Sequence, residues 1–110
     1  MEQGMVGIAS GMALSGLKPI VYTIVNFLVF RAIEQIRNDV VLQNLNVKFV
    51  GTGANDYFKF LGLSHCCGQD DIALMKLINL KVFDPYTAIK PFPELVQEWI
   101  RHNKAAYIRV

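Results

Sequence analysis

Runs of apolar, often β-branched residues alternate along this chain with segments whose apolar residues follow helical spacing. The strand-like runs cover residues 20–25, 47–50, 80–83 and 107–110. The helical segments cover residues 5–14, 26–42, 71–78 and 93–102. The first run lacks clean alternation of apolar and polar residues, which is typical of a strand buried on both faces. Strands that alternate with helices predict a three-layer α/β/α fold with a mainly parallel sheet.

The composition narrows the class of protein. Hydrophobic residues make up 53% of the 110 residues and charged residues 18%, which excludes a disordered chain. The net charge is +2 and the basic residues are scattered, so we expect no nucleic-acid binding. A small domain this apolar has too little polar surface to cover itself, and we therefore expect one domain with a large interface.

A membrane-spanning segment is not expected. Residues 5–30 are largely apolar, but Lys18 and Pro19 interrupt them, and the uninterrupted run 19–30 has 12 residues. A helix needs about 20 apolar residues to cross a bilayer. Cys66 and Cys67 are neighbours and cannot link distant segments, and the first residues lack the basic region of a secretory signal. These features favour a cytoplasmic location.

Candidate functional residues gather where the strands are expected to end. Ligands of parallel α/β sheets bind beyond the carboxyl ends of the strands, which places residues 23–27 and the long loop 51–64 at that edge. His65, at the end of the loop, is a candidate proton-handling group, although an ordinary loop histidine would show the same pattern. The cluster of His65, Cys66 and Cys67 lacks the spaced pairs of ligands that zinc requires. The glycines of 51–53 give only half of a dinucleotide-binding fingerprint and favour a mobile loop.

Two further features each permit a structural and a functional interpretation. Phe27 and Phe30, together with Tyr22, form an aromatic group at a strand-to-helix corner. They could pack in the core or offer a platform to a flat heterocycle. Glu2 precedes a helix of small residues, where an acidic side chain interacts favourably with the helix dipole even without any function.

Several segments in order resemble the pyrimidine-binding domain of the transketolase family of thiamine diphosphate enzymes. Glu2-Gln3 and the small-residue helix resemble the family's Glu-Gln motif, and Leu61-Gly62-Leu63-Ser64-His65 resembles its Gly-x-Thr/Ser-His segment. The remaining similar stretches cover residues 18–23, 30–39, 43–48, 71–75 and 107–110. The resemblance extends over essentially the whole chain.

The resemblance implies roles for individual residues. The family's glutamate, here Glu2, hydrogen-bonds a ring nitrogen of the cofactor's aminopyrimidine and shares a proton with it. Phe27 corresponds to an aromatic ring against the pyrimidine, with Phe30 close by and Ile24 in a further pocket position. His65 corresponds to a histidine that lines the substrate channel. The implied reaction moves a two-carbon unit between sugar phosphates.

The resemblance also implies what this chain does not supply. The family's domain begins with a strand that is missing before Glu2, and the Gly-Asp-Gly…Asn segment that binds magnesium and diphosphate is absent. We therefore expect residues 1–110 to be a partial domain, inactive alone, that shares thiamine diphosphate with a diphosphate-binding partner in a homo- or hetero-oligomer. Magnesium would come only through that partner.

Three alternatives share the expected fold. Deoxyxylulose-phosphate synthases and the β subunits of 2-oxo-acid dehydrogenases use the same glutamate. A non-catalytic remnant that acts as an interaction protein would also fit, and it is favoured by the irregular spacing between His65 and Asp71.

Overall fold

The computed structural model describes residues 1–110, in which helices and parallel strands alternate. The N-terminal half contains α1 (Glu2–Leu14), β1 (Ile20–Ile24), α2 (Val25–Val29), α3 (Ile33–Gln35), a π-helical segment (Ile36–Val41) and β2 (Lys48–Thr52). Two 3₁₀ turns follow (Lys59–Leu61 and Leu63–His65), and then α4 (Asp70–Leu77), β3 (Lys81–Phe83), α5 (Phe92–Arg101) and β4 (Ala106–Arg109). The α1 helix stops before Gly16, whose φ of 89° suits glycine, and α5 starts with a proline in its first turn.

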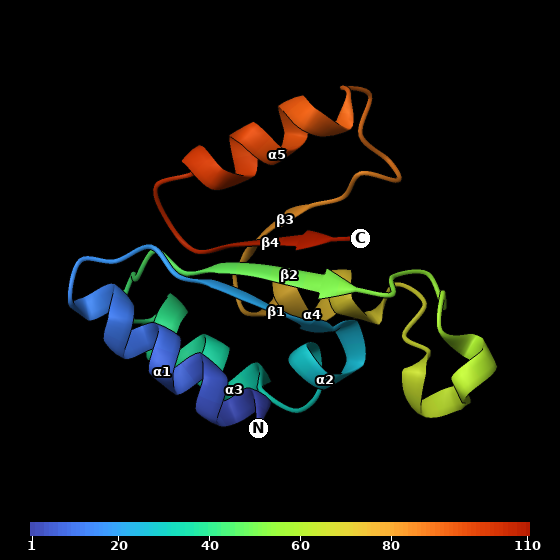
Figure 1. Ribbon diagram of the computed structural model, residues 1–110, viewed down its shortest axis with the longest axis horizontal. Coiled ribbons are helices and arrows are strands. Elements are labelled where there is room, and N and C mark those ends of the chain that lie inside the picture. The colour runs from blue at the N-terminus through green and yellow to red at the C-terminus, as the bar shows by residue number, and fades with distance from the viewer.

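The four strands form one parallel sheet in the order β1-β2-β4-β3. Helices α1 to α4 lie on one face and α5 lies on the other, as Figure 1 shows. The expected three-layer α/β/α fold with a parallel sheet is confirmed. Since all strands run the same way, their carboxyl ends meet at one edge, beside the loop that carries the 3₁₀ turns (Figure 1, yellow-green).

Each face of the sheet has its own apolar core. On the face of α1, Val21, Phe49 and Tyr107 are neighbours across three strands and pack against Val6 of α1. On the other face, α5 covers only the half of the sheet formed by β4 and β3. The smaller core there consists of Leu95, Trp99, Ala106, Ile108 and Phe83.

The prediction that the first strand is buried on both faces is wrong. β1 is an edge strand, and Ile20 and Tyr22 are 56% and 62% exposed. Both side chains point toward the face of α5, which does not reach across to β1. Tyr22 is therefore not part of an aromatic group with Phe27 and Phe30.

The prediction of one continuous helix over 26–42 is also wrong. The chain leaves the helix after Val29, turns at 30–32, and continues as α3 and then the π-helical segment. The apolar spacing continues across the break because buried side chains of α2, of the turn and of the π-helical segment face the same core, and Ile33 of α3 packs against it. The buried residues are Val25, Leu28, Val29, Ala32, Ile36 and Val40. In this structure no helix combines the length and the apolar character needed to cross a bilayer.

A buried ion pair joins the start of α4 to the end of β4. Arg109 and Asp71 are both 0% exposed, and Nε of Arg109 donates to Asp71 Oδ2 at 2.9 Å. The Tyr107 hydroxyl donates to the same oxygen at 2.7 Å, and burial together with this contact raises the pKa of Tyr107 far above its usual value. A second nitrogen of Arg109 donates to the carbonyl of Gly68. Removing one partner of such a pair would leave an uncompensated buried charge.

We expect Asp71→Asn to destabilise the fold by about 3–5 kcal/mol, because Arg109 loses the carboxylate to which it donates and keeps only Asp84, whose Oδ1 lies 3.7 Å from Nη1. Asp70→Asn changes the exposed neighbour in the same helical turn and should cost about 1 kcal/mol or less. Urea unfolding of the two variants measures the difference. Equal destabilisation by both variants would contradict this role for the ion pair.

Lys48 is a second buried cation, at the opposite end of the strands. Its side chain is enclosed, and Nζ donates to the carbonyls of His102 and Lys104 and to Asn46 Oδ1. No carboxylate pairs with it. Loss of water around the ammonium, and then the charge of Lys18, lower the pKa of Lys48 to about 8.

This lowered pKa predicts a pH-dependent stability. Between about pH 8 and pH 10.5 the unfolded chain binds more protons at Lys48 than the native chain, so the free energy of unfolding rises with pH. Relative to Lys48→Met, the natural sequence should gain on the order of 1–3 kcal/mol across this window. Urea unfolding of both proteins at the two pH values tests this, and a constant difference between them would disprove it.

Candidate functional site

A cavity opens at the carboxyl edge of the sheet, between α2 and the second 3₁₀ turn. Its volume is about 450 Å³, and it is lined by Asn26, Phe27, Phe30, Arg31, Leu63, Ser64 and Cys66. These residues come from two segments that are distant in sequence and meet because α2 and the loop both follow parallel strands. This is the edge where the sequence analysis placed the functional residues.

The Phe27 ring is the centre of this site. The guanidinium carbon of Arg31 lies 4.3 Å from the centroid of the Phe27 ring, and the His65 ring approaches it at 5.1 Å with an interplanar angle of 70°. Phe30 also lines the cavity and is 50% exposed. Phe27 is half-buried beneath Arg31, and both phenylalanines line the cavity and are not part of the hydrophobic core.

Glu2 reaches this group of residues through Arg31. Oε2 of Glu2 accepts a hydrogen bond from Arg31 Nη1 at 3.0 Å and lies 3.2 Å from the amino group of Met1. The Glu2 side chain is only 14% exposed, and Glu2 does not itself line the cavity. Its own backbone N–H, then the Met1 amino group and Arg31, hold the pKa of the Glu2 carboxyl below its usual value, against a raising effect of burial. The carboxyl is therefore ionised here.

Asn26 holds the two sides of the cavity together. Its Nδ2 donates to the carbonyl of Cys66 at 2.7 Å, across 40 residues of sequence. Its side-chain oxygen Oδ1 is buried and has no hydrogen-bond partner. Because a buried acceptor without a donor is unfavourable, this oxygen is suited to a ligand that brings an N–H group.

The structure brings most of the predicted site residues together. Glu2 is paired with Arg31, and Arg31 lies over the Phe27 ring. The Phe27 ring in turn contacts His65. The His65 ring nitrogen Nδ1 also lies 3.0 Å from the Ser64 hydroxyl. Ile24 precedes α2 and is half-buried, but it does not line the cavity.

Arg31 is not among the functional residues predicted from the sequence. A signal was present, since an arginine four residues after a phenylalanine can reach the aromatic ring over one helical turn. The partner Glu2 is 29 residues away in sequence, and no local pattern reveals that contact.

The other candidates have structural explanations. The glycines of 51–53 leave room for aromatic rings: a Cβ at Gly51 would collide with Tyr107, and one at Gly53 would collide with Phe58. Cys67 is buried, and burial raises the pKa of its thiol to about 12, so the thiol is unreactive. No three His, Cys, Asp or Glu side chains lie close enough together to hold a metal ion.

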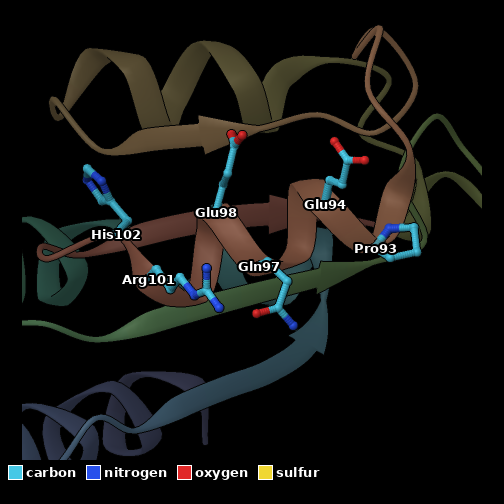
Figure 2. Close-up of a pocket in the computed structure, with 6 residues that line it drawn as sticks. All are labelled: Pro93, Glu94, Gln97, Glu98, Arg101 and His102. Atoms are coloured by element: carbon cyan, nitrogen blue, oxygen red, sulfur yellow. The ribbon is translucent and has the colours of Figure 1, made fainter.

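A second hollow lies on the far side of the sheet, over α5. Figure 2 shows its six lining residues, all from one helix and its C-cap: Pro93, Glu94, Gln97, Glu98, Arg101 and His102. Its volume of about 640 Å³ exceeds that of the cavity at Phe27, but it contains no buried polar group and no aromatic platform. We assign no chemistry to it.

Comparisons with known proteins give consistent results. Residues 1–110 match the family "Transketolase, pyrimidine binding domain". The chain is 32% identical over 110 residues to a subunit of the apulose-4-phosphate transketolase of Actinobacillus succinogenes, covering 99% of this chain and 35% of that protein. It is 34% identical over 114 residues to 1-deoxy-D-xylulose-5-phosphate synthase of Prochlorococcus marinus, covering 99% of this chain and 17% of that protein.

A solved structure described as "Split gene transketolase, inactive beta4 tetramer" is also similar. It has a TM-score of 0.79 and 32% sequence identity, and the match covers 99% of this chain and 34% of that one. The chain therefore spans about a third of the length of the two transketolase proteins and less of the synthase.

We expect Asn26→Ala to loosen the wall of the cavity, because the Cys66 carbonyl loses its donor. The loss should be about 1–2 kcal/mol in stability, with faster amide exchange over residues 63–67. Asn38→Ala, which removes only an exposed bond to Arg37, is the control. Hydrogen exchange measured by mass spectrometry tests this, and unchanged exchange over residues 63–67 would contradict it.

Proposed function

Since this chain belongs to the family of transketolase pyrimidine-binding domains, we propose that it binds the pyrimidine ring of thiamine diphosphate. The observation that carries the proposal is the cavity at Phe27. It combines an aromatic ring on its wall, a carboxylate that is linked to this ring through Arg31, and an unpartnered buried acceptor. A flat heterocycle with N–H donors matches this set of groups.

In the proposed complex, each residue has a distinct role. Phe27 stacks on the pyrimidine, Phe30 and Ile24 border it, and Glu2 holds a proton at a ring nitrogen. His65, in edge contact with Phe27, handles a proton of the substrate. The bound cofactor would supply a carbon centre that stabilises negative charge, which these side chains do not supply themselves.

The proposal includes a partner. Diphosphate and magnesium would be bound by a separate domain or subunit, and the cofactor would lie between it and this chain in a homo- or hetero-oligomer. The relative from A. succinogenes is named as one subunit of a transketolase, and the similar solved structure is described as a tetramer, which supports such an arrangement. We further propose a cytoplasmic location, in keeping with two free cysteines.

The proposed reaction moves a two-carbon unit between sugar phosphates, supported by the name of the apulose-4-phosphate transketolase relative. A deoxyxylulose-phosphate synthase activity is the second candidate, because the Prochlorococcus enzyme is 34% identical to this chain. Turnover of a ketose phosphate or of pyruvate by this chain with its diphosphate-binding partner distinguishes the two. A non-catalytic role as an interaction protein, favoured by the irregular spacing between His65 and Asp71, is the third candidate.

The isolated chain should bind the pyrimidine half of the cofactor at the cavity. We expect 4-amino-5-hydroxymethyl-2-methylpyrimidine to shift the backbone NMR signals of Asn26, Phe27 and Ser64, but not those of α5. Phe27→Leu should weaken binding roughly three- to tenfold, because the aromatic stacking surface is lost. Phe92→Leu, at an exposed phenylalanine on α5, is the control. Shifts confined to α5, or none, would refute the proposal.

The same chain should bind complete thiamine diphosphate only weakly, with or without magnesium, since the diphosphate has no site here. Isothermal titration calorimetry measures this affinity. Tight, magnesium-dependent binding by the 110-residue chain would show that no partner is needed.

A further inference from the structure

The guanidinium group of Arg31 lies where the Glu2 carboxylate and the Phe27 ring meet. Its Nη1 donates to Glu2 Oε2 at 3.0 Å, and its central carbon lies 4.3 Å from the centroid of the Phe27 ring. Arg31 lines the cavity, whereas Glu2 does not. The Glu2 carboxylate therefore lies behind Arg31, which separates it from the cavity.

A guanidinium group shares its recognition chemistry with an aminopyrimidine. Both are planar, both present N–H donors along one edge, and both stack on aromatic faces. The contacts that Arg31 makes here, one to a carboxylate and one to an aromatic ring, are those expected of the pyrimidine ring in the proposed function.

We propose that Arg31 is a built-in competitor for the pyrimidine site, which occupies the ligand's position between Glu2 and Phe27 until the ligand displaces it. This inference rests on the proposed function and concerns the regulation of the same site. The residue acts as a positioning residue for Glu2 and not as a catalytic one.

The energetic conditions for displacement are met. The Arg31 side chain is 55% exposed, and Glu2 is its only hydrogen-bond partner, so it can swing into water without leaving a buried donor behind. Both contacts are made by the solvent-exposed end of Arg31, where ion pairs and cation–π contacts are weak. A bound heterocycle that replaces both contacts can therefore displace the side chain.

Displacement would also change the protonation of Glu2. The cationic groups within 4.0 Å of its carboxylate are Arg31 and the amino group of Met1. When Arg31 leaves, one of the groups that lower the pKa of Glu2 is removed, so this pKa rises toward its usual value, although the backbone N–H of Glu2 and the Met1 amino group still lower it. The carboxyl then accepts a proton more readily than it does beside Arg31, which favours sharing a proton with a ring nitrogen of the ligand.

The test uses the 110-residue chain and the probe 4-amino-5-hydroxymethyl-2-methylpyrimidine. Arg31→Met removes the charge and keeps the length of the side chain, and Arg31→Lys keeps the charge but loses the planar group. Arg37→Met is the control, because Arg37 is exposed and bonds only to Asn38. Carbon-13 NMR of the Glu2 carboxyl, assigned with Glu2→Gln, gives its pKa, and the probe titration gives the affinity.

We expect Arg31→Met to raise the pKa of Glu2 and to bind the probe roughly three- to tenfold more tightly than the natural sequence. Arg31→Lys should give values between those of the natural sequence and Arg31→Met. Arg37→Met should change neither the pKa of Glu2 nor the affinity for the probe. If the probe shifts the cavity signals but Arg31→Met binds it no more tightly, the proposed function stands and the competition is refuted. An unchanged pKa of Glu2 would also refute it. If the probe shifts the cavity signals of none of these proteins, the proposed function is refuted, and the inference about Arg31 is refuted with it.

Discussion

The buried pair of Arg109 and Asp71 is the interaction on which the rest of the structure depends. It ties the last strand of the sheet to the start of α4, and through the Gly68 carbonyl it fixes the end of the loop that carries His65. Both charges are fully buried, so the pair depends on the hydrogen bonds made by Nε and Nη2 of Arg109, while Nη1 has only Asp84 Oδ1 at 3.7 Å. The Tyr107 hydroxyl contributes one of them, and Gly51 leaves the space through which that ring reaches Asp71.

The cavity follows from this anchor. With Gly68 held by Arg109 and by Asp56 Oδ1, the chain before it passes α2, where Asn26 bonds the Cys66 carbonyl. That contact places His65 against Phe27. From the opposite side, α1 brings Glu2 to Arg31. The site thus combines one wall held by a buried network with another held by the ion pair of Arg31 and Glu2, in which the Arg31 side chain is 55% exposed.

Much of the fold could be predicted from the sequence. The alternation of apolar runs and helical spacing placed all four strands and the three-layer architecture, because that pattern reflects burial directly. It failed for Tyr22, since the pattern of one strand does not reveal how far a helix on the opposite face extends. It also failed at residues 30–32, because side chains can keep facing one core while the backbone leaves the helix. The resemblance to a known family indicated Glu2, Phe27 and His65, which the structure brings together, but not Arg31, whose partner is distant in the chain.

The most direct measurement is a crystal structure of this chain with 4-amino-5-hydroxymethyl-2-methylpyrimidine. We predict that the ring lies over Phe27, within hydrogen-bond distance of Glu2, with the Arg31 side chain turned into solvent. A ring bound elsewhere, such as the hollow over α5, with the contact between Arg31 and Glu2 intact, would contradict both the site and the role of Arg31.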